Sequence, residues 1–452
     1  MPQGARVLVV GHNEAAETRL SSRLRLCGCD CETLDPTQPD HANRDARRAD
    51  VVILNLLSDL GRRSPRDFVD FARRLRRRVD GPLLPVLMLG DSDPAHTACA
   101  LEAAANSDID DVMLSPVNDL QIVERIRSLM RLNTMHDELV RRLNTSARYG
   151  IDAPVSVPGA NAAVEDVHVL VVGASSSYAT IEAALAKSAT LVGALTTATA
   201  SDYLERNRFE IIIVDVAEDP QEALDFVKCC RANTKLFNTP IILLARPGVV
   251  PDTSPVFLSG VTDLMANPPH REELQVRVHA LVREVRFRES LREVYAKARH
   301  MATSDALTGL YSRGFALEHI KSLINAADAR GLPFTVAHGS IDNINEINML
   351  HGYVIGDRMI RQAGDVLGLL TRGEDLSVRY SGARFLVLLP DTTASAAQKA
   401  INRILGVMNH TDFTIPELSE PVPLMMSIGV AGYNDGDTPE GIVARAVAKT
   451  NN

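Results

Sequence analysis

Two stretches of this sequence repeat the same succession of short apolar runs, and no other feature restricts the possible fold as strongly. In each stretch the first run ends in a glycine, and helical segments separate it from a second and a third run. Apolar runs of this length are typical of strands that a parallel sheet buries on both faces. The repeat therefore predicts two copies of one α/β unit. The runs lie at residues 6–11, 51–54 and 85–89 in the first stretch and at 168–173, 211–214 and 240–244 in the second.

The length and composition leave room for a third domain and exclude several classes of protein. A chain of 452 residues fits about three domains of roughly 150 residues each. Hydrophobic residues make up 45% and charged residues 23%, which is ordinary for a globular protein, and the formal net charge of −9 argues against binding to nucleic acid. The sequence has no long apolar run and no basic, then apolar start, so we expect a cytoplasmic protein without a membrane span. Its six cysteines lack the spacing of a metal site, and we expect no bound metal.

A helix is expected to close each copy, at residues 119–143 and 271–299, and the stretch 150–163, rich in Ala, Pro and Gly, indicates a linker. The second of these helices is highly charged but carries apolar side chains along one side. Two interpretations remain open for it, a solvated linker helix or a dimer seam. The apolar side chains are those of Leu274, Val278, Leu281, Val282 and Val285.

The two copies resemble the receiver domains of response regulators. The resemblance implies a flavodoxin-like parallel sheet of five strands in each copy. It also implies a phosphorylation site made of an acidic pair, an acceptor aspartate, a hydroxyl residue and a lysine. In that order, the first copy has Gly11 and His12, Asn55, Gly90 and Ser115 at these positions, and the second has Gly173 and Ala174, Asp215, Ala245 and Asn267.

Neither copy is expected to accept a phosphoryl group readily. An amide is a poor nucleophile, so Asn55 should not react, whether it is a natural residue or an engineered replacement. Asp215 keeps the carboxylate but lacks the acidic neighbours that hold Mg²⁺ and the lysine that neutralises the product.

From Asp305 onward, six short motifs follow one another. They are Asp305-Ala-Leu-Thr-Gly-Leu310, Ser312-Arg313, Ile347-Asn348, Gly356-Asp357, Arg372-Gly-Glu-Asp375 and Ser381-Gly-Ala-Arg-Phe385. This succession resembles the GGDEF domain of diguanylate cyclases, an α+β fold of the nucleotidyl cyclase type. Two receivers followed by a GGDEF domain resemble the PleD-type response regulators over the whole chain.

The resemblance implies a surviving guanine pocket but no catalysis. An amide at Asn348 and a carboxylate at Asp357 can read the edge of guanine. Synthesis of cyclic di-GMP also needs metal ions around the triphosphate. The family's metal carboxylates fall at Ser340 and Ala383, its phosphate-binding lysine at Asn345, and its first turn glycine and second acidic residue at Ser381 and Arg384, with Gly382 retained. We therefore expect no diguanylate cyclase activity and no metal.

The R-x-x-D motif, from Arg372 to Asp375, stands five residues ahead of this altered turn. In GGDEF domains a motif at this offset is the regulatory site for cyclic di-GMP, and Arg403 matches a second arginine of that site. Arginine forks fit phosphate and guanine O6 and N7, and an aspartate can accept from guanine N–H groups. The resemblance thus implies that Arg372, Asp375 and Arg403 bind cyclic di-GMP as a ligand.

Together these expectations describe a non-catalytic cyclic di-GMP receptor, most similar to the PopA-type effectors. That resemblance implies a location at a cell pole, a homodimer through the receivers, and recruitment of a protease adaptor such as RcdA to the ClpXP pathway of cell-cycle proteolysis. Two alternatives remain, a weak or conditional diguanylate cyclase and a GTP-binding regulator that uses Asn348, Asp357 and Arg384. The expected segments are a degenerate receiver at 1–134, a helix end and linker at 135–165, an adaptor-like receiver at 166–286, a linker helix at 287–303 and a degenerate GGDEF domain at 304–452.

Overall fold

The chain folds into two compact units. The structure, a computed structural model, describes residues 5–11, 13–35, 49–57, 65–78, 84–90, 103, 109–115, 117–150, 164–216, 219–233, 235–250, 252–298, 304–411, 413–415, 418 and 421–450. The first unit comprises Met1–Asn133 and Pro158–Phe287, and the second comprises Thr134–Val157 and Arg288–Asn452. The helices α5 and α10 each begin in the first unit and end in the second.

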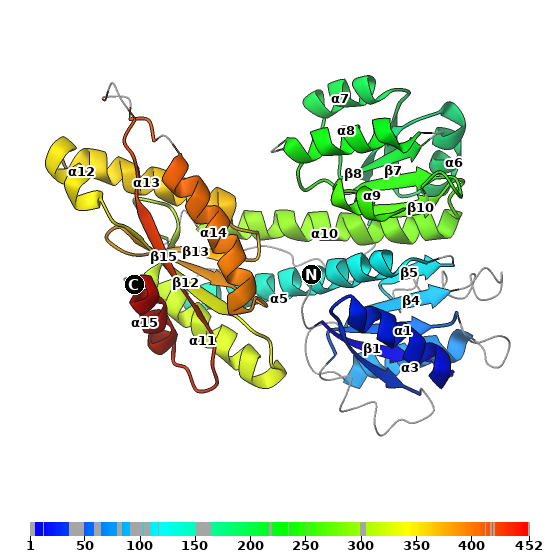
Figure 1. Cartoon of the computed structure of the whole chain (residues 1–452), viewed down its shortest axis with the longest axis horizontal. Helices are drawn as coiled ribbons and strands as arrows, with labels where there is room; N and C mark the ends of the chain where they lie inside the picture. The colour runs from blue at the N-terminus through cyan, green and yellow to red at the C-terminus, as the bar shows by residue number, and fades with distance from the viewer. Residues whose placement is uncertain are drawn as a thin grey trace. The chain divides into compact units, whose positions relative to one another are not determined.

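The first unit contains two parallel sheets of five strands each, so the fold expected from the repeat is confirmed (Figure 1). The strand orders β2-β1-β3-β4-β5 and β10-β9-β8-β6-β7 become identical when each domain is numbered from its own first strand, and both are flavodoxin-like. The first domain consists of β1 (Arg6–Val10), α1 (Glu14–Leu26), β2 (Asp30–Leu34), β3 (Val51–Asn55), α3 (Pro65–Arg78), β4 (Val86–Gly90), β5 (Asp111–Leu114) and α5 (Asp119–Arg148). The second consists of β6 (Val167–Val172), α6 (Ser175–Leu185), β7 (Ala189–Ala194), α7 (Thr197–Arg206), β8 (Ile211–Val216), α8 (Pro220–Ala232), β9 (Ile241–Ala245), α9 (Ser254–Leu258), β10 (Asp263–Ala266) and α10 (Arg271–Ala298).

The apolar side of α10 belongs to the core of the second α/β domain. Leu274, Val278, Leu281 and Val282 are fully buried and pack with strand residues of the sheet, among them Ile242 of β9. For these four residues both interpretations, a solvated helix and a dimer seam, were therefore wrong, while Val285, the fifth residue of the stripe, is half-buried. A helix that closes a parallel sheet has its own sheet to cover, and that contact buries the stripe.

A buried group of four charged side chains joins the two α/β domains within the first unit. The Arg125 guanidinium lies 2.9 Å from a carboxylate oxygen of Asp111 and 2.9 Å from one of Asp263. Arg277 donates to both oxygens of Asp263, each at 2.9 Å. None of the four is more than 3% exposed, and a buried charge is tolerated only when it is paired in this way. Because the chain's own receivers occupy these faces, a homodimer through the receivers would have to use other faces.

The second unit is built around a mixed five-stranded sheet of order β11-β13-β14-β12-β15, in which only β11 and β13 run parallel. Its elements are β11 (Tyr311–Ser312), α11 (Arg313–Arg330), β12 (Thr335–Ile341), α12 (Ile344–His351), α13 (Tyr353–Leu370), β13 (Leu376–Ser381), β14 (Arg384–Leu389), α14 (Ala394–His410), β15 (Met426–Gly432) and α15 (Pro439–Thr450).

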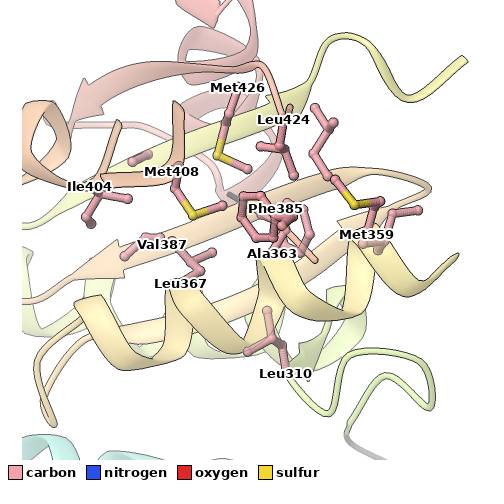
Figure 2. Packing of buried hydrophobic residues seen from close by; sticks show 14 of the residues in the cluster. Leu310, Met359, Ala363, Leu367, Phe385, Val387, Ile404, Met408, Leu424 and Met426 are labelled. Carbon is pink, nitrogen blue, oxygen red and sulfur yellow. The ribbon is translucent and has the colours of Figure 1, made fainter. Parts of the chain in front are cut away.

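Helices cover both faces of this sheet. Buried residues of α11 and α15 pack against one face and those of α13 and α14 against the other. Figure 2 shows the second of these cores, in which Met359 and Leu367 of α13 and Met408 of α14 surround Phe385 of β14. Alternate residues of β14 serve the two cores, as the side-chain period of a strand requires. This packing fixes the two ends of β13, where the predicted site residues lie.

Candidate functional site

The R-x-x-D motif forms the short loop between α13 and β13. The backbone N–H of Arg372 donates to Asp375 Oδ2 at 2.9 Å, and the N–H of Asp375 donates to the Arg372 carbonyl at 3.2 Å. An aspartate that accepts from a nearby backbone N–H is a common way to fix a turn. The Asp375 side chain therefore orders the loop backbone, while the Arg372 side chain remains exposed.

Arg403 approaches the same loop from α14. Its guanidinium donates to the Leu370 carbonyl at 3.5 Å, two residues before Arg372, and its side chain is exposed. The structure thus brings together the three residues that the sequence assigned to one ligand. They come from a loop and from a helix that begins almost twenty residues later, and the order of β13, β14 and α14 makes them neighbours.

Asp375 and Glu374 are buried carboxylates, with exposed fractions of 7% and 4%. Burial and the neighbouring Glu374 carboxylate raise the pKa of Asp375 to about 7, although Arg372 and Arg142 oppose the rise. Within the described part of the chain, Asp375 Oδ1 is buried and accepts no hydrogen bond. An acceptor oxygen of this kind gains from a ligand N–H group, because burial has already removed its water.

Three buried residues that the sequence did not indicate lie behind the loop. Arg142 of α5 donates from Nη2 to the carbonyls of Glu374 at 3.0 Å and Asp375 at 2.8 Å. Glu138 accepts from Arg142 Nε at 2.7 Å, and His319 Nε2 lies 2.9 Å from Glu138 Oε1. Glu138 and Arg142 are four residues apart on α5, a spacing that could have indicated the pair, but His319 and the loop are far away in the sequence. The helix had been expected to end at residue 143 rather than at Arg148.

The predicted guanine pocket lies at the junction of α12 and α13. Asn348 stands near the end of α12 beside Gly356, where an added Cβ would lie 1.8 Å from Asn348 Oδ1, so only glycine leaves room for the amide. In the described structure Asn348 Oδ1 is buried and has no hydrogen-bond partner, and Asp357 is exposed one residue beyond Gly356. Asn345, at the position of the family's lysine, is exposed in the first turn of α12.

The turn between β13 and β14 carries the altered catalytic positions. Ser340 of β12 pairs directly with Arg384 of β14, and Ser381 and Gly382 are exposed. Gly382 has φ +54°, a left-handed conformation that favours glycine. Ala383 is half-buried, and its carbonyl accepts from the N–H of Ile341 at 3.1 Å. A hydroxyl, a methyl group and a guanidinium cannot replace the anionic oxygens that Mg²⁺ requires, so these residues do not fit a catalytic metal pair.

The electrostatics of this end of the sheet also oppose a cation. His338 lies on β12 two residues before Ser340, and burial together with the positive charge of Arg384 lowers its pKa to about 4. A site that holds Mg²⁺ needs a negative potential, and here the strand residue paired with Ser340 is the cation Arg384.

The opening D-A-L-T-G-L motif supports the turn from behind. Arg379 of β13 donates to both oxygens of Asp305, at 3.0 and 3.1 Å, and to the Gly382 carbonyl at 2.9 Å. Asp305 also accepts from the N–H and the hydroxyl of Thr308, and these donors outweigh burial and lower its pKa. Asp305 and Arg379 therefore support the backbone of the turn at Gly382.

In the first receiver an internal carboxylate fills the acceptor pocket. Asn55 is buried at the end of β3, and its Nδ2 lies 3.4 Å from Oε1 of Glu17, a buried residue of α1. An added Cβ at Gly11 would lie 1.9 Å from the same Glu17 oxygen, so the glycine makes room for this carboxylate. The sequence did not indicate Glu17, and His12 falls outside the described residues.

In the second receiver Asp215 is held by neutral donors. The Ser177 hydroxyl donates to Oδ2, and the Asn267 amide donates to Oδ1. Gly173 faces Asp215 with φ +145°, and an added Cβ there would lie 2.6 Å from the Asp215 Cβ. Asp215 is thus paired with an amide at Asn267, the position at which the resemblance implies a lysine.

Across the residues that the structure describes, no three His, Cys, Asp or Glu side chains gather as metal ligands would. The helices in the same residues are too short or too polar to cross a membrane.

Comparison with known proteins gives relatives for the third domain and for the chain as a whole. Residues 302–451 match the family model "Diguanylate cyclase, GGDEF domain". Response regulator PleD of Caulobacter vibrioides is 27% identical over 454 residues, which cover 98% of this chain and 95% of that protein. Diguanylate cyclase A of Treponema denticola is 29% identical over 151 residues, or 32% of this chain and 40% of that protein.

A solved structure is also similar. The coiled coil and GGDEF domain of DgcB from Caulobacter crescentus, crystallised in complex with c-di-GMP, shows 26% sequence identity and a TM-score of 0.32, and the match covers 39% of this chain and 91% of that one. The chain thus has two flavodoxin-like domains followed by a GGDEF domain, and it is related to a response regulator over its whole length.

Proposed function

We propose that this chain is a non-catalytic receptor for cyclic di-GMP, which binds the dinucleotide at the R-x-x-D loop of a degenerate GGDEF domain. One observation carries the proposal. Arg372, Asp375 and Arg403 lie together as two exposed guanidinium groups and one buried acceptor, in a domain whose turn has no carboxylate at the metal positions Ser340 and Ala383.

The chemistry of this loop matches the ligand. Cyclic di-GMP carries two phosphates and two guanines, so it offers anionic oxygens, O6 and N7 acceptors, and N–H donors. Arginine forks bind phosphate or a guanine edge through paired hydrogen bonds. Asp375 Oδ1 can accept a guanine N–H and so gain the hydrogen bond that it lacks in the free protein.

The altered turn supports the non-catalytic part of the proposal. Phosphoryl transfer by this family depends on metal ions, because the reaction needs positive charge placed against the triphosphate. Losing the ligands at Ser340 and Ala383 removes several kcal/mol of transition-state stabilisation at each position, on the order of the loss of one oxyanion donor. Arg384 can attract a phosphate group but cannot activate the attacking hydroxyl, since a guanidinium stays protonated.

We further propose that ligand binding, rather than phosphorylation, is the input that controls partner recruitment. The pockets around Asn55 and Asp215 support this step, because neither pairs a reactive carboxylate with metal ligands and a lysine. The resemblance to PopA-type effectors suggests the output, which is delivery of an adaptor such as RcdA to the ClpXP pathway at a cell pole. Co-purification of that adaptor should depend on added cyclic di-GMP.

A titration with two single variants tests the proposal. The Arg372→Ala variant removes a charged fork from the loop and should weaken cyclic di-GMP binding by roughly 2–4 kcal/mol, or about 30- to 1000-fold. The Arg384→Ala variant removes an equally exposed arginine from the turn and should leave the affinity unchanged. Parental affinity in the Arg372→Ala variant would place the ligand elsewhere and reject the assignment.

The guanine pocket gives a second candidate, a GTP-binding regulator. The observation that favours it is Asn348 Oδ1, which is buried without a protein partner, next to the exposed Asp357. The same pair of variants separates the two functions, because a GTP sensor would lose GTP affinity in Arg384→Ala and keep it in Arg372→Ala.

A further inference from the structure

We propose that Arg142 is the positioning residue of the R-x-x-D loop, which it holds in the ligand-binding conformation by donating to the carbonyls of Glu374 and Asp375. The proposal rests on the proposed function, since it concerns the same site. Arg142 does not touch the ligand in this account. It acts through the backbone of the loop.

Arg142 is buried and bonds to the loop through two backbone carbonyls. Its side chain is 1% exposed, and Nη2 makes both hydrogen bonds to the loop, at 3.0 Å to the Glu374 carbonyl and 2.8 Å to the Asp375 carbonyl. These two carbonyls belong to the last two residues before β13, which are buried. Without Arg142 the two carbonyls would lose this hydrogen-bond donor. A buried carbonyl without a donor is destabilising, so the Nη2 group of Arg142 both pairs these two carbonyls and fixes their directions.

A second set of contacts fixes the guanidinium itself. Glu138, one turn earlier on α5, accepts from Arg142 Nε at 2.7 Å and neutralises its charge. The guanidinium carbon lies 5.9 Å from the centre of the Tyr311 ring, and His319 packs against Glu138 from α11. With its own rotamer fixed in this way, Arg142 meets the requirement for a positioning group, which must itself be rigid.

The loop is also enclosed on its other sides. A Cβ at Gly373 would lie 3.7 Å from Arg288 Cγ and 3.9 Å from Leu291 Cδ1, both on α10, so that helix packs against the middle of the motif. The charged groups that act on Asp375 are Glu374 and Arg372 in the loop and Arg142 from α5. Arg288 of α10 lies against Gly373, and Arg403 of α14 donates to the Leu370 carbonyl. Among the described contacts, Arg142 donates to the backbone carbonyls at the buried end of the loop.

The charge of Arg142 has a second effect that can be measured separately. It lowers the pKa of Asp375, against burial and Glu374, which raise it to about 7. Removing the charge should therefore raise the pH at which Asp375 ionises and at which the ligand binds half-maximally. A residue with only a structural role would lower stability without moving this midpoint.

The neighbouring Arg141 provides a matched control. It lies on the same helix and donates to the other oxygen of Glu138 at 2.6 Å, but it makes no hydrogen bond to the loop among the described contacts. Arg142→Met and Arg141→Met thus remove the same charge from the same carboxylate, and only the first removes the two bonds to the loop. Arg142→Lys keeps the charge and loses the fork.

The experiment measures cyclic di-GMP affinity from pH 5.5 to 8.5 for the parent, these three variants and Arg372→Ala, with circular dichroism to confirm folding. We expect Arg142→Met to bind about 10- to 100-fold more weakly with a raised pH midpoint, and Arg142→Lys to bind more weakly with the parental midpoint. Arg141→Met should stay within about threefold of the parent.

Two results would overturn the inference while the proposed function stands: parental affinity and midpoint in Arg142→Met, or equal losses in Arg141→Met and Arg142→Met. If Arg142→Met does not fold, Arg142→Lys decides, because a parental affinity in that variant shows that the fork is not needed. Parental affinity in Arg372→Ala rejects the proposed function, and this inference fails with it.

Discussion

The two ends of β13 differ in the burial of their charged side chains and in the contacts that support them. At its start, the R-x-x-D loop is framed by buried charged groups from α5, and its Asp375 accepts from the backbone. At its end, the turn from Ser381 to Arg384 is mostly exposed, and its cationic residue faces solvent where the family places carboxylates. Buried charged side chains support the first region, and the second is supported at its backbone by Arg379 and by the pairing of β12 with β14.

The difference indicates whether the side chains of each region also hold its backbone in place. The side chains from Ser381 to Arg384 are not needed for the contact that Arg379 makes with the turn, because Arg379 is held by Asp305 and donates to the Gly382 carbonyl. The loop has no such independence, since Asp375 closes the loop and also serves as a candidate ligand-binding group. Replacement in the loop should therefore change both structure and binding, and replacement in the turn should change neither by much.

The largest effect expected from this comparison is the absence of turnover at the turn. With GTP and Mg²⁺ or Mn²⁺, the parent chain should form no cyclic di-GMP at enzyme-like rates, which are typically about 1–10³ s⁻¹. The physical reason is that Ser340 and Ala383 offer no anionic metal ligand. Chromatography of the nucleotides over several hours is the measurement, and repeated turnover by purified protein would remove the distinction between the two regions.

Mutation of the buried charged residues behind the loop should lower protein stability far more than mutation of the exposed residues of the turn. Glu138→Ala leaves the Arg142 guanidinium buried without its counter-charge and should lower the free energy of unfolding by about 3–5 kcal/mol. Arg384→Ala, at the exposed turn, should stay within about 0.5 kcal/mol. Chemical denaturation followed by circular dichroism compares them, and equal small changes would show that the charges behind the loop contribute little.

The pH dependence of binding should be the smallest effect, and its sign follows from Asp375. Its pKa is raised from 3.8 to about 7, and the ionised form is the one that accepts guanine N–H donors. Affinity should therefore rise by about tenfold from pH 6 to pH 8 and level off above, since about one proton must leave below the pKa. The contribution of Asp375 to the free energy of unfolding should change in the opposite direction. It is greatest below about pH 4 and declines as the pH rises towards 7.

An Asp375→Asn variant is the control for this pH dependence. It removes the titrating carboxylate, so its affinity for cyclic di-GMP should be lower and flat between pH 6 and pH 8. A parental pH profile in this variant would assign the titration to another group.

The sequence predicted the architecture more completely than the site. Short apolar runs and their repeat determine parallel strands, because a strand buried on both faces has few alternatives. The apolar stripe on α10 was misjudged because an amphipathic pattern does not show which surface the helix will cover. In the structure the stripe packs against the sheet of the second α/β domain. The i,i+4 spacing of Glu138 and Arg142 on α5 was a local signal that we did not use. Their contacts with His319 and with the loop join elements far apart in the chain, and no local pattern encodes such a contact.

The spacing of a motif predicted contacts more reliably where the residues lie close together in the sequence. Asp375 and Arg372 are three residues apart and bond to each other through the backbone, as their spacing allows. The burial of Asp375 could not be read from the motif, since it depends on other elements that pack against the loop, among them α5 and α10. The same limit applies to Asn55, whose Glu17 partner comes from another element.

The central claim, that this chain binds cyclic di-GMP without acting on GTP, is tested most directly by calorimetric titration of the two nucleotides into the same preparation of the parent protein. We expect saturable heat of binding with cyclic di-GMP and no comparable heat with GTP, because the loop presents two arginines and a buried acceptor while the turn has lost its metal ligands. Saturable binding of GTP together with no binding of cyclic di-GMP would contradict the account.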